Sequence, residues 1–509
     1  MYLKHGLVAL LALGPVSAAW AVPATDEGAA RLKGVFQTYF GGTEGVVTVT
    51  PKGETYDLVI DAKPLLAQIP DKTMKVEVGA LTYHLTDNGD GTWSVSENQV
   101  MSWSVNVPGV MEQTASTKIE STGIWDEALP GFREQKAVMT GYTVNTTQYQ
   151  PAPVPVSADG TPAPETGAAE PGAAEPVLFS RDTQSTDKFE STLTGKAGTA
   201  GGVDYDMAYR AEGSYQTAEY TDLNGFGPMK FDATIPGYDG AARISGLRSQ
   251  GVLGLLGWFV AHPSQELIAG SQDGLRDKLS AAMPLWEDAT MDMSLRDMKI
   301  GSPFGEFGIG SAIAQIDMSG VEAEGKFREM VTLGGLKVPA GLAPHWAQPI
   351  LPTEISFDFS VSGFNLAAPA KLIIEGFDLK AESPLEKVSA EQLQSAFFGG
   401  KPVLLGLAPS AIKGEGYEIG YQGEASIDPN LPPAMKAKVT ATGLDKIQAA
   451  LQAAPPEQAQ QPLMMLQMAQ MMGKPGPNGE LVWDIDATDP SGAVSVNGTV
   501  MGGAPAPQQ

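Results

Sequence analysis

The sequence predicts an α+β protein that is mainly β, with long antiparallel sheet and a few short helices packed on one face of it. Two observations lead to this fold class. Apolar and polar residues alternate with a period of two in many segments, and a smaller number of segments carry helix caps and stops. Alternation of this kind gives a strand one apolar and one solvated face, as in antiparallel sheets that face water on one side.

Two hairpins are expected near the start of the chain. In residues 45–62, two alternating strands flank a turn at 51–54, and in residues 74–97 two more strands flank the turn DNGDG at 87–91. Glycine with Asn or Asp between alternating segments is a strong hairpin signal.

The later strands show the same pattern. In EISFDFSVSG, Ile355, Phe357 and Phe359 alternate with polar residues, so one side of the strand is apolar and the other is solvated. Further strands of this character are expected at 291–300, 436–443, 480–487 and 493–500.

Short helices are expected between these strands. Ser389 is a predicted N-cap, Gln392 completes a capping box, and Gly399 ends that helix. Other helices are predicted at 251–261, 265–282, 444–454 and 462–472, the last with Pro462 in its first turn.

Residues 151–176 hold seven prolines among Ala, Gly and Glu, a composition that forms no packed core. This linker or long surface loop separates a β-rich segment, 22–150, from a larger β-rich segment with helices, 177–501. The two segments are either two domains or one sheet with an insertion. The tail 502–509 is expected to be disordered.

Residues 1–21 have the pattern of a cleavable signal peptide: Lys4, an apolar run, and Ala19-Trp20-Ala21 as a small-x-small cleavage site. We therefore expect export, most plausibly to a Gram-negative periplasm. The chain has no cysteine, so neither disulfides nor an acylated cysteine are available. No later run is long enough to span a membrane, since the longest, 252–261, is too short.

Charge excludes one class of partner. Without residues 1–21 the chain has 32 Lys and Arg against 59 Asp and Glu, a formal charge of −27, and the acidic residues are spread along it. Nucleic acids and anionic membrane surfaces would be repelled by this charge.

The segment LMMLQMAQMM, 463–472, raises the question of a soft-metal site. Methionine thioethers bind Cu(I), and M-x-x-M occurs twice. No Cys or His lies nearby, however, and a helix that is apolar nearly all round is typical of a buried element or of an adaptable groove lining. We favour core or groove lining, and we expect no metal and no cofactor.

Three further patterns were weighed for chemistry. Asn88, Asp90, Gly91 and Glu97 approach a calcium-loop spacing, but Thr86 stands where the first carboxylate belongs, which favours a hairpin turn. Asp484 and Asp486 share a strand face and are more typical of a solvated surface than of an acid–base pair. His84, His262 and His345 are scattered, and no catalytic motif is present. We expect a protein without catalytic residues.

The C-terminal part, about 250 residues, resembles exported bacterial proteins of the YdgA-like and AsmA-like kind. The likeness is one of pattern: a Leu-rich helix ending in DKLSAAMPLWEDATMDMSLRDMKIG, then ISFDFSVSGF, and finally LMMLQMAQMMG with ELVWDIDATDPSGAVSVNG. The resemblance implies a long, curved antiparallel sheet with helices against its concave side, used to shield lipid chains or to scaffold envelope assembly. It implies no catalytic residues.

A sheet with one apolar face must cover that face, and the few short helices would leave part of it open. We therefore expect a non-enzymatic periplasmic protein that binds a lipid or other amphiphile in an apolar groove of the cell envelope. The expected lining comprises Trp258, Phe259, Phe357, Phe359, Phe397, Phe398, Met464, Met468 and Met472. Two alternatives stay open: a ligand-free scaffold or assembly factor for envelope proteins, and an enzyme acting on cell-wall glycan.

Overall fold

The computed structural model describes residues 23–67, 74–150, 176–198, 201–222, 225, 227–262 and 264–503. The predicted signal peptide lies outside the described residues, as does the predicted linker up to residue 175. Gly502 and Gly503, which were expected in a disordered tail, end the last strand, and the rest of that tail lies outside the described residues.

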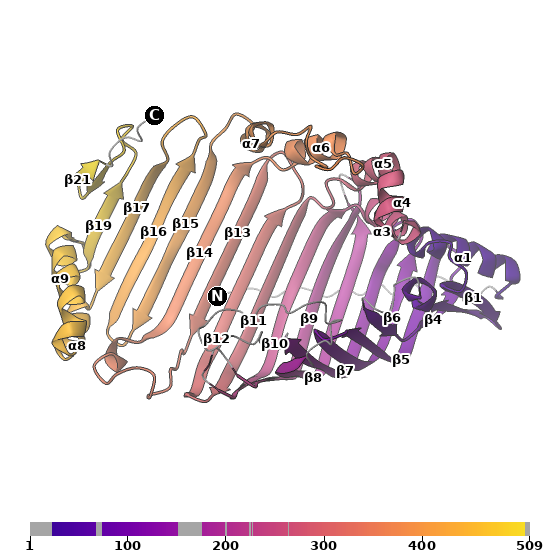
Figure 1. Ribbon diagram of the computed structural model, residues 1–509, viewed down its shortest axis with the longest axis horizontal. Coiled ribbons are helices and arrows are strands. Elements are labelled where there is room, and N and C mark those ends of the chain that lie inside the picture. The colour runs from indigo at the N-terminus through magenta and orange to yellow at the C-terminus, as the bar shows by residue number, and fades with distance from the viewer. Residues whose placement is uncertain are drawn as a thin grey trace, which may run out of the picture.

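The described strands form a single antiparallel sheet of 21 strands (Figure 1). From β5 to β17 each strand pairs with the next one along the chain, so the sheet is built almost entirely from consecutive hairpins. The order is β1–β2–β4–β5 at one end and β17–β19–β20–β21 at the other, with β3 also beside β5 and β18 beside β19.

The strand bounds are as follows: β1 Val47–Lys52, β2 Thr55–Ile60, β3 Lys75–Val78, β4 Leu81–Asp87, β5 Thr92–Val107, β6 Met111–Asp126, β7 Gly131–Gln150, β8 Val177–Ala197, β9 Val203–Tyr220, β10 Met229–Leu247, β11 Asp288–Ser302, β12 Gly305–Ser319, β13 Gly325–Gly334, β14 Pro352–Phe364, β15 Val403–Gly414, β16 Tyr417–Ile427, β17 Ala434–Thr442, β18 Lys474–Pro475, β19 Leu481–Asp486, β20 Ala493–Val496 and β21 Thr499–Gly503.

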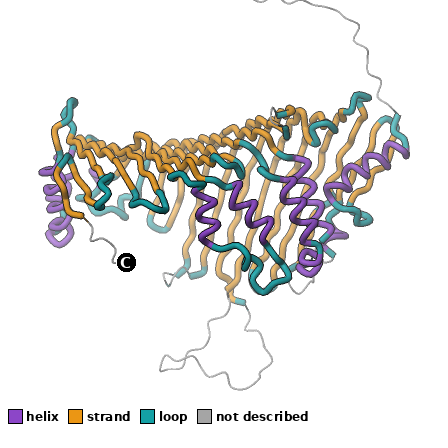
Figure 2. The backbone as a smooth tube through the Cα atoms, turned by 90° about the horizontal axis from the view of Figure 1, so that it is seen from above, coloured by secondary structure: helices purple, strands orange, loops and turns teal. Residues whose placement is uncertain are grey.

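The helices are inserted at a few of the strand connections: α1 Asp26–Phe40, α2 Lys63–Leu66, α3 Ser249–Ala261, α4 Gln265–Gly270, α5 Gln272–Ala282, α6 Ala367–Gly376, α7 Ala390–Phe398, α8 Leu444–Gln452 and α9 Pro456–Met472, with a 3₁₀ turn at Gln348–Ile350. Figure 2 shows the longer helices on one side of the sheet, which twists along its length. The mainly β fold class with helices on one face is therefore confirmed. No helix in the described part of the chain is long and apolar enough to cross a bilayer.

The register assigns each strand residue to one of two faces, because residues directly opposite each other in an antiparallel ladder project from the same side. Phe327, for example, lies opposite Met318 on one neighbour and Val361 on the other. Followed across the ladders, this rule defines an apolar face, which carries Tyr205, Met207, Tyr209 and Ala211 on β9; Tyr238, Ala242 and Ile244 on β10; Met291, Met293 and Leu295 on β11; Ala314, Ile316 and Met318 on β12; Phe327, Val331 and Leu333 on β13; Ile355, Phe357, Phe359 and Val361 on β14; and Leu405, Leu407 and Ile412 on β15.

The opposite side of the sheet is a charged face. Ion pairs there link neighbouring residues of one strand, as between Lys188 and Glu190, or adjacent strands, as between Arg243 and Asp206. The expectation of one apolar and one solvated side, made from single strands, is confirmed for β10–β15.

Each strand from β7 to β12 inserts one extra residue at the same level of the sheet. The ladders skip these positions, which form what we call the bulge row: Gly141, Asp187, Gly213, Pro236, Asp297 and Gly310. Gly141, Gly213 and Asp297 have positive φ.

The bulge row keeps the apolar face continuous. On β6, which has no extra residue, Ala115 and Ile119 lie on one face, and they are opposite Val144 and Met139 of β7. An even-numbered and an odd-numbered residue of β7 therefore share a face because Gly141 is inserted between them. On β10, for the same reason, Ile235 and Tyr238 both belong to the apolar face.

The buried core consists of small clusters, two of which lie at the ends of the sheet. At one end α1 covers Tyr56, Leu58, Leu85 and Trp93. At the other end α8 and α9 cover Ala441 and Trp483, and a further cluster lies among α3, α5 and the segment after α6, around Trp258, Leu275 and Phe377.

Several predicted elements are confirmed, and others need correction. Both early hairpins form, and α7 has Ser389 as N-cap, the complete capping box and Gly399 in the left-handed conformation. The helix predicted at 265–282 is two helices, α4 and α5, separated at Ser271. The last helix begins at Pro456, so Pro462 lies inside it. The helices α1, α2 and α6 were not predicted.

Candidate binding surface

The middle of the apolar face, from β10 to β15, has no second layer over it among the described residues. Met291 is 40% exposed and Phe357 is 38% exposed, although both project from the apolar side. The neighbouring apolar side chains of these strands are only partly buried, because they contact each other across the sheet but no covering helix. This surface, the apolar face of β10–β15, is the candidate site.

Its side chains form a continuous ladder. The rings of Phe357 and Phe359 are stacked, with centroids 6.1 Å apart and an angle of 16° between their planes. Phe357 lies opposite Val331, and Phe359 lies opposite Leu407. Unbranched and aromatic side chains side by side give a surface that can adapt to a flexible apolar partner.

The structure brings together only some of the residues predicted to line a groove. Phe357 and Phe359 lie in the centre of the apolar face, as expected from their alternation. Phe397 and Phe398 are in edge-to-face contact on α7, with centroids 5.5 Å apart, and Phe397 stacks on Phe364 at the end of β14.

The other predicted residues lie away from this surface. Trp258 is buried among α3, α5 and Phe377 and stacks on His262, with centroids 4.0 Å apart, while Phe259 is exposed. Helix α3 therefore packs against α5 and α1. Gly257 explains the observed packing, since an added Cβ would lie 2.5 Å from the Thr38 carbonyl oxygen of α1.

The methionine-rich helix is only partly buried. Met472 packs with Leu466 and Ala469 against Trp483, whose indole Nε1 donates a 2.8 Å hydrogen bond to the Ala469 carbonyl. Met464 and Met468 are exposed. The prediction of core packing thus holds for one side of α9, and the other side faces away from the cluster.

The residues on β10–β12 that complete the surface were not predicted from the sequence. A signal was present: on β10 the apolar residues are odd-numbered at Phe231, Ala233 and Ile235 and even-numbered from Tyr238 onward. A change of parity inside an alternating segment is the mark of an inserted residue in a long strand.

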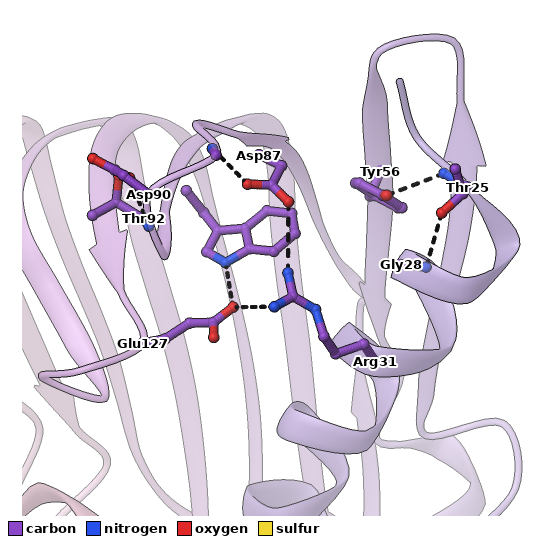
Figure 3. A network of polar contacts seen from close by, with 10 residues as sticks. Thr25, Gly28, Arg31, Tyr56, Asp87, Asp90, Thr92 and Glu127 are labelled. Carbon is purple, nitrogen blue, oxygen red and sulfur yellow. Dashed lines mark hydrogen bonds and ion pairs between the residues drawn. The ribbon is translucent and has the colours of Figure 1, made fainter. Parts of the chain in front are cut away.

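The N-terminal helix closes one end of the apolar face through a polar network (Figure 3). The Arg31 guanidinium lies 5.3 Å from the centroid of the Trp93 ring and forms ion pairs of 3.5 Å with Asp87 and with Glu127. The Trp93 indole Nε1 donates to Glu127 at 2.8 Å. Thr25 caps the helix by accepting from a backbone N–H of its first turn. These contacts hold α1 over the end of the face.

Several hollows lie elsewhere among the described residues, and two of them show the range. One of about 540 Å³ is open and lined by polar residues of β4–β8, including Ser94, Thr122 and Thr192. A smaller one of about 280 Å³ lies between α5 and α6, lined by Met283, Val321 and Ile374 among others. None of the residues predicted to line a groove borders either hollow.

The acidic residues considered for metal binding or catalysis form hydrogen bonds or ion pairs within the protein. The turn at 87–91 joins β4 to β5, and the Asp90 carboxylate accepts hydrogen bonds from the Thr92 N–H and hydroxyl, which lower the pKa of Asp90. Asp484 lies 3.7 Å from the Lys438 ammonium on the charged face. Within the described ranges no three His, Cys, Asp or Glu side chains come together as a metal site.

The histidines are likewise apart. His84 Nδ1 lies 2.6 Å from the Asp57 carboxylate on the charged face, and this contact is the largest cause of the lowered pKa of Asp57. His262 lies far along the chain from His84 and stacks on Trp258.

No protein-family model, no curated protein and no solved structure matches this chain. The resemblance to YdgA-like and AsmA-like proteins therefore stays a prediction, and function has to be argued from the surface itself.

Proposed function

We propose that this protein binds the hydrocarbon part of an amphiphile on the apolar face of β10–β15 and serves in the bacterial periplasm without catalysing a reaction. The observation that carries the proposal is the row of partly exposed apolar side chains on one side of six consecutive strands. The proposed location rests on the signal-peptide pattern of residues 1–21.

The exposed apolar side chains of β10–β15 indicate a surface that binds a partner. Soluble monomers rarely expose apolar patches larger than a few hundred Å², and larger patches mark sites of interaction. Removing an alkyl chain from water gains about 0.8 kcal/mol for each CH₂ group that is fully buried. A chain lying flat on the sheet would be buried on one side and would gain part of that amount.

The dimensions suit an acyl chain. Neighbouring strands lie about 4.8 Å apart, so the distance from β10 to β15 is about 24 Å. One leaflet of a bilayer has a hydrocarbon thickness of about 15 Å, half of the usual 30 Å core. An extended acyl chain therefore has room to lie across the strands.

A pair of charge substitutions on opposite faces tests the proposal. Phe357→Glu places a carboxylate on the apolar face, while Ile313→Glu places one on the opposite face, where Ile313 is 47% exposed and opposite Thr332. We expect lipid extracted from protein purified from a native host, and binding of a fluorescent alkyl probe with an uncharged head group, to fall sharply in Phe357→Glu only. A carboxylate introduced in contact with the bound alkyl chain would weaken binding by several kcal/mol unless it stayed solvated.

Mass spectrometry of the gently purified protein gives the decisive result. Consistently empty wild-type protein would contradict amphiphile binding, and equal loss in both variants would contradict binding on the apolar face. Capture of a discrete protein partner in place of lipid would favour the alternative role as an assembly factor.

A further inference from the structure

We infer that the amphiphile bound by the proposed function carries an uncharged, hydroxyl-rich head group, and that this head group lies on β8 and β9 next to the apolar face of β10–β15. The inference rests on the proposed function and adds the class of ligand. It comes from how charge and polarity are distributed along the apolar side of the sheet.

The first observation is the absence of basic residues. Within the described strands β8–β17, every Lys and Arg projects from the charged face; Arg210, for example, lies opposite Glu190 and Asp239, and Lys436 lies opposite Glu424. The apolar side of these strands instead carries two carboxylates, Asp182 and Glu329, besides those of the bulge row. A phosphate or carboxylate head group would meet repulsion and find no cation to pair with.

The second observation is a patch of amides and hydroxyls on β8 and β9. It lies between the bulge row and the ends of these strands at Val177 and Tyr220. Gln184 and Gln216 are exposed and lie opposite each other. Beside them the Thr186 and Ser214 hydroxyls are 3.1 Å apart. Uncharged donors and acceptors of this kind pair with hydroxyl groups, which also donate and accept.

The third observation is a set of aromatic side chains where this patch meets the apolar residues. The Phe189 and Tyr209 rings are stacked with centroids 6.0 Å apart, and Tyr209 contacts Tyr238 at 6.5 Å. Burial raises the pKa of Tyr209 and of Tyr238 above the usual value, so both phenols stay uncharged. Tyrosine combines an apolar ring with a polar tip and is enriched where an apolar region meets a wet one.

Along one side of the sheet, the side chains therefore change from amides, hydroxyls and the Asp182 carboxylate on β8 and β9 to mainly apolar ones on β11–β15, with the tyrosines between. An amphiphile with a glycosyl or polyol head matches this order: the head contacts Gln184 and Gln216, and the chain crosses the strands toward Phe357.

Three probes with the same twelve-carbon chain test the head-group class: dodecyl maltoside, dodecyl sulfate and dodecyltrimethylammonium, each below its micelle-forming concentration. Calorimetric titration of the full-length protein should give the lowest Kd for the maltoside. If the sulfate or the trimethylammonium binds as tightly or more tightly, the head-group inference is wrong while the proposed function stands. If none of the three binds, the proposed function falls with it.

A gain-of-charge variant sharpens the test. Gln216→Lys places a cation on the apolar side, whereas Thr234→Lys places one on the charged face of the next strand. We expect Gln216→Lys to strengthen sulfate binding about two- to fivefold, as one solvated ion pair would, and Thr234→Lys to leave the ratio of the three Kd values unchanged. Equal effects of the two variants would overturn the placement of the head group.

Discussion

At the scale of single residues, Arg328 and Asp358 connect two strands on the charged face. The Arg328 Nε and Nη2 atoms donate to the two Asp358 oxygens at 2.9 and 2.8 Å, and this pairing is the largest cause of the lowered pKa of Asp358. Because the folded pKa is lowered, the contribution to stability is complete above the ordinary aspartate pKa of about 4. It is lost as pH falls through the folded value.

We expect Asp358→Asn to lower the free energy of unfolding by about 1 kcal/mol at pH 7, the upper end of the range for solvent-accessible pairs. The difference from the wild type should shrink as pH falls below about 4, because the carboxylate of the unfolded wild type then becomes protonated while the folded one still pairs with Arg328. Urea unfolding at pH 7 and pH 3.5 measures both values. Asp292→Asn, an exposed carboxylate on the same face, is the control. A pH-independent loss in Asp358→Asn would show that the ion pair does not act as described.

At the scale of elements, the bulge row depends on residues that tolerate positive φ. Gly141 has φ +61° with nothing within 4 Å of an added Cβ, while at Gly213, φ +63°, an added Cβ would lie 2.1 Å from the Asp187 carboxylate. Left-handed backbone costs a non-glycine residue about 1–2 kcal/mol. Gly141→Ala should therefore lower stability by about that amount, Gly141→Asn by less, and Gly213→Ala by more because Asp187 must also move.

Thermal unfolding of the three variants ranks these costs. An unchanged unfolding temperature in Gly141→Ala would mean that β7 does not need a residue in the left-handed conformation at this position. The comparison between Gly141 and Gly213 separates backbone conformation from side-chain contact, since both glycines have nearly the same φ.

Some elements could be predicted from the sequence and others could not. Ser389, Gln392 and Gly399 specify α7 by local hydrogen bonds, and the alternation around Phe357 assigns a face within one strand, so both were predictable. The bulge row was not recognised because an inserted residue changes the parity of the alternation, so that one long strand resembles two short ones. The exposure of Met464 escaped prediction for another reason: only the position of Trp483 decides which side of α9 is buried.

At the scale of the whole molecule, the buried side chains of the described residues form separate clusters. The cluster around Trp93 and the cluster around Trp483 are separated by the long row of strands from β6 to β16, each of which pairs chiefly with its two neighbours. A structure built from nearest-neighbour contacts can lose order at one end while the other end stays folded.

Deletion of buried side chains at the two ends tests this independence. Leu32→Ala removes an α1 side chain that is 1% exposed, and Trp483→Ala removes the centre of the other cluster. Each should cost about 3–5 kcal/mol locally. Hydrogen exchange followed by mass spectrometry should show faster exchange in β1–β5 for Leu32→Ala and in β17–β19 for Trp483→Ala, each with the opposite end unchanged.

Leu256→Ala, which deletes the same atoms as Leu32→Ala at a position that is 53% exposed, should change neither end. Faster exchange at both ends in either cluster variant would instead indicate one cooperative unit. If the two ends unfold independently, neither cluster stabilises the middle of the sheet. The stability of the middle then depends on its own hydrogen bonds and on any ligand bound to its apolar face. An amphiphile bound there should then slow exchange in β10–β15 more than in either end.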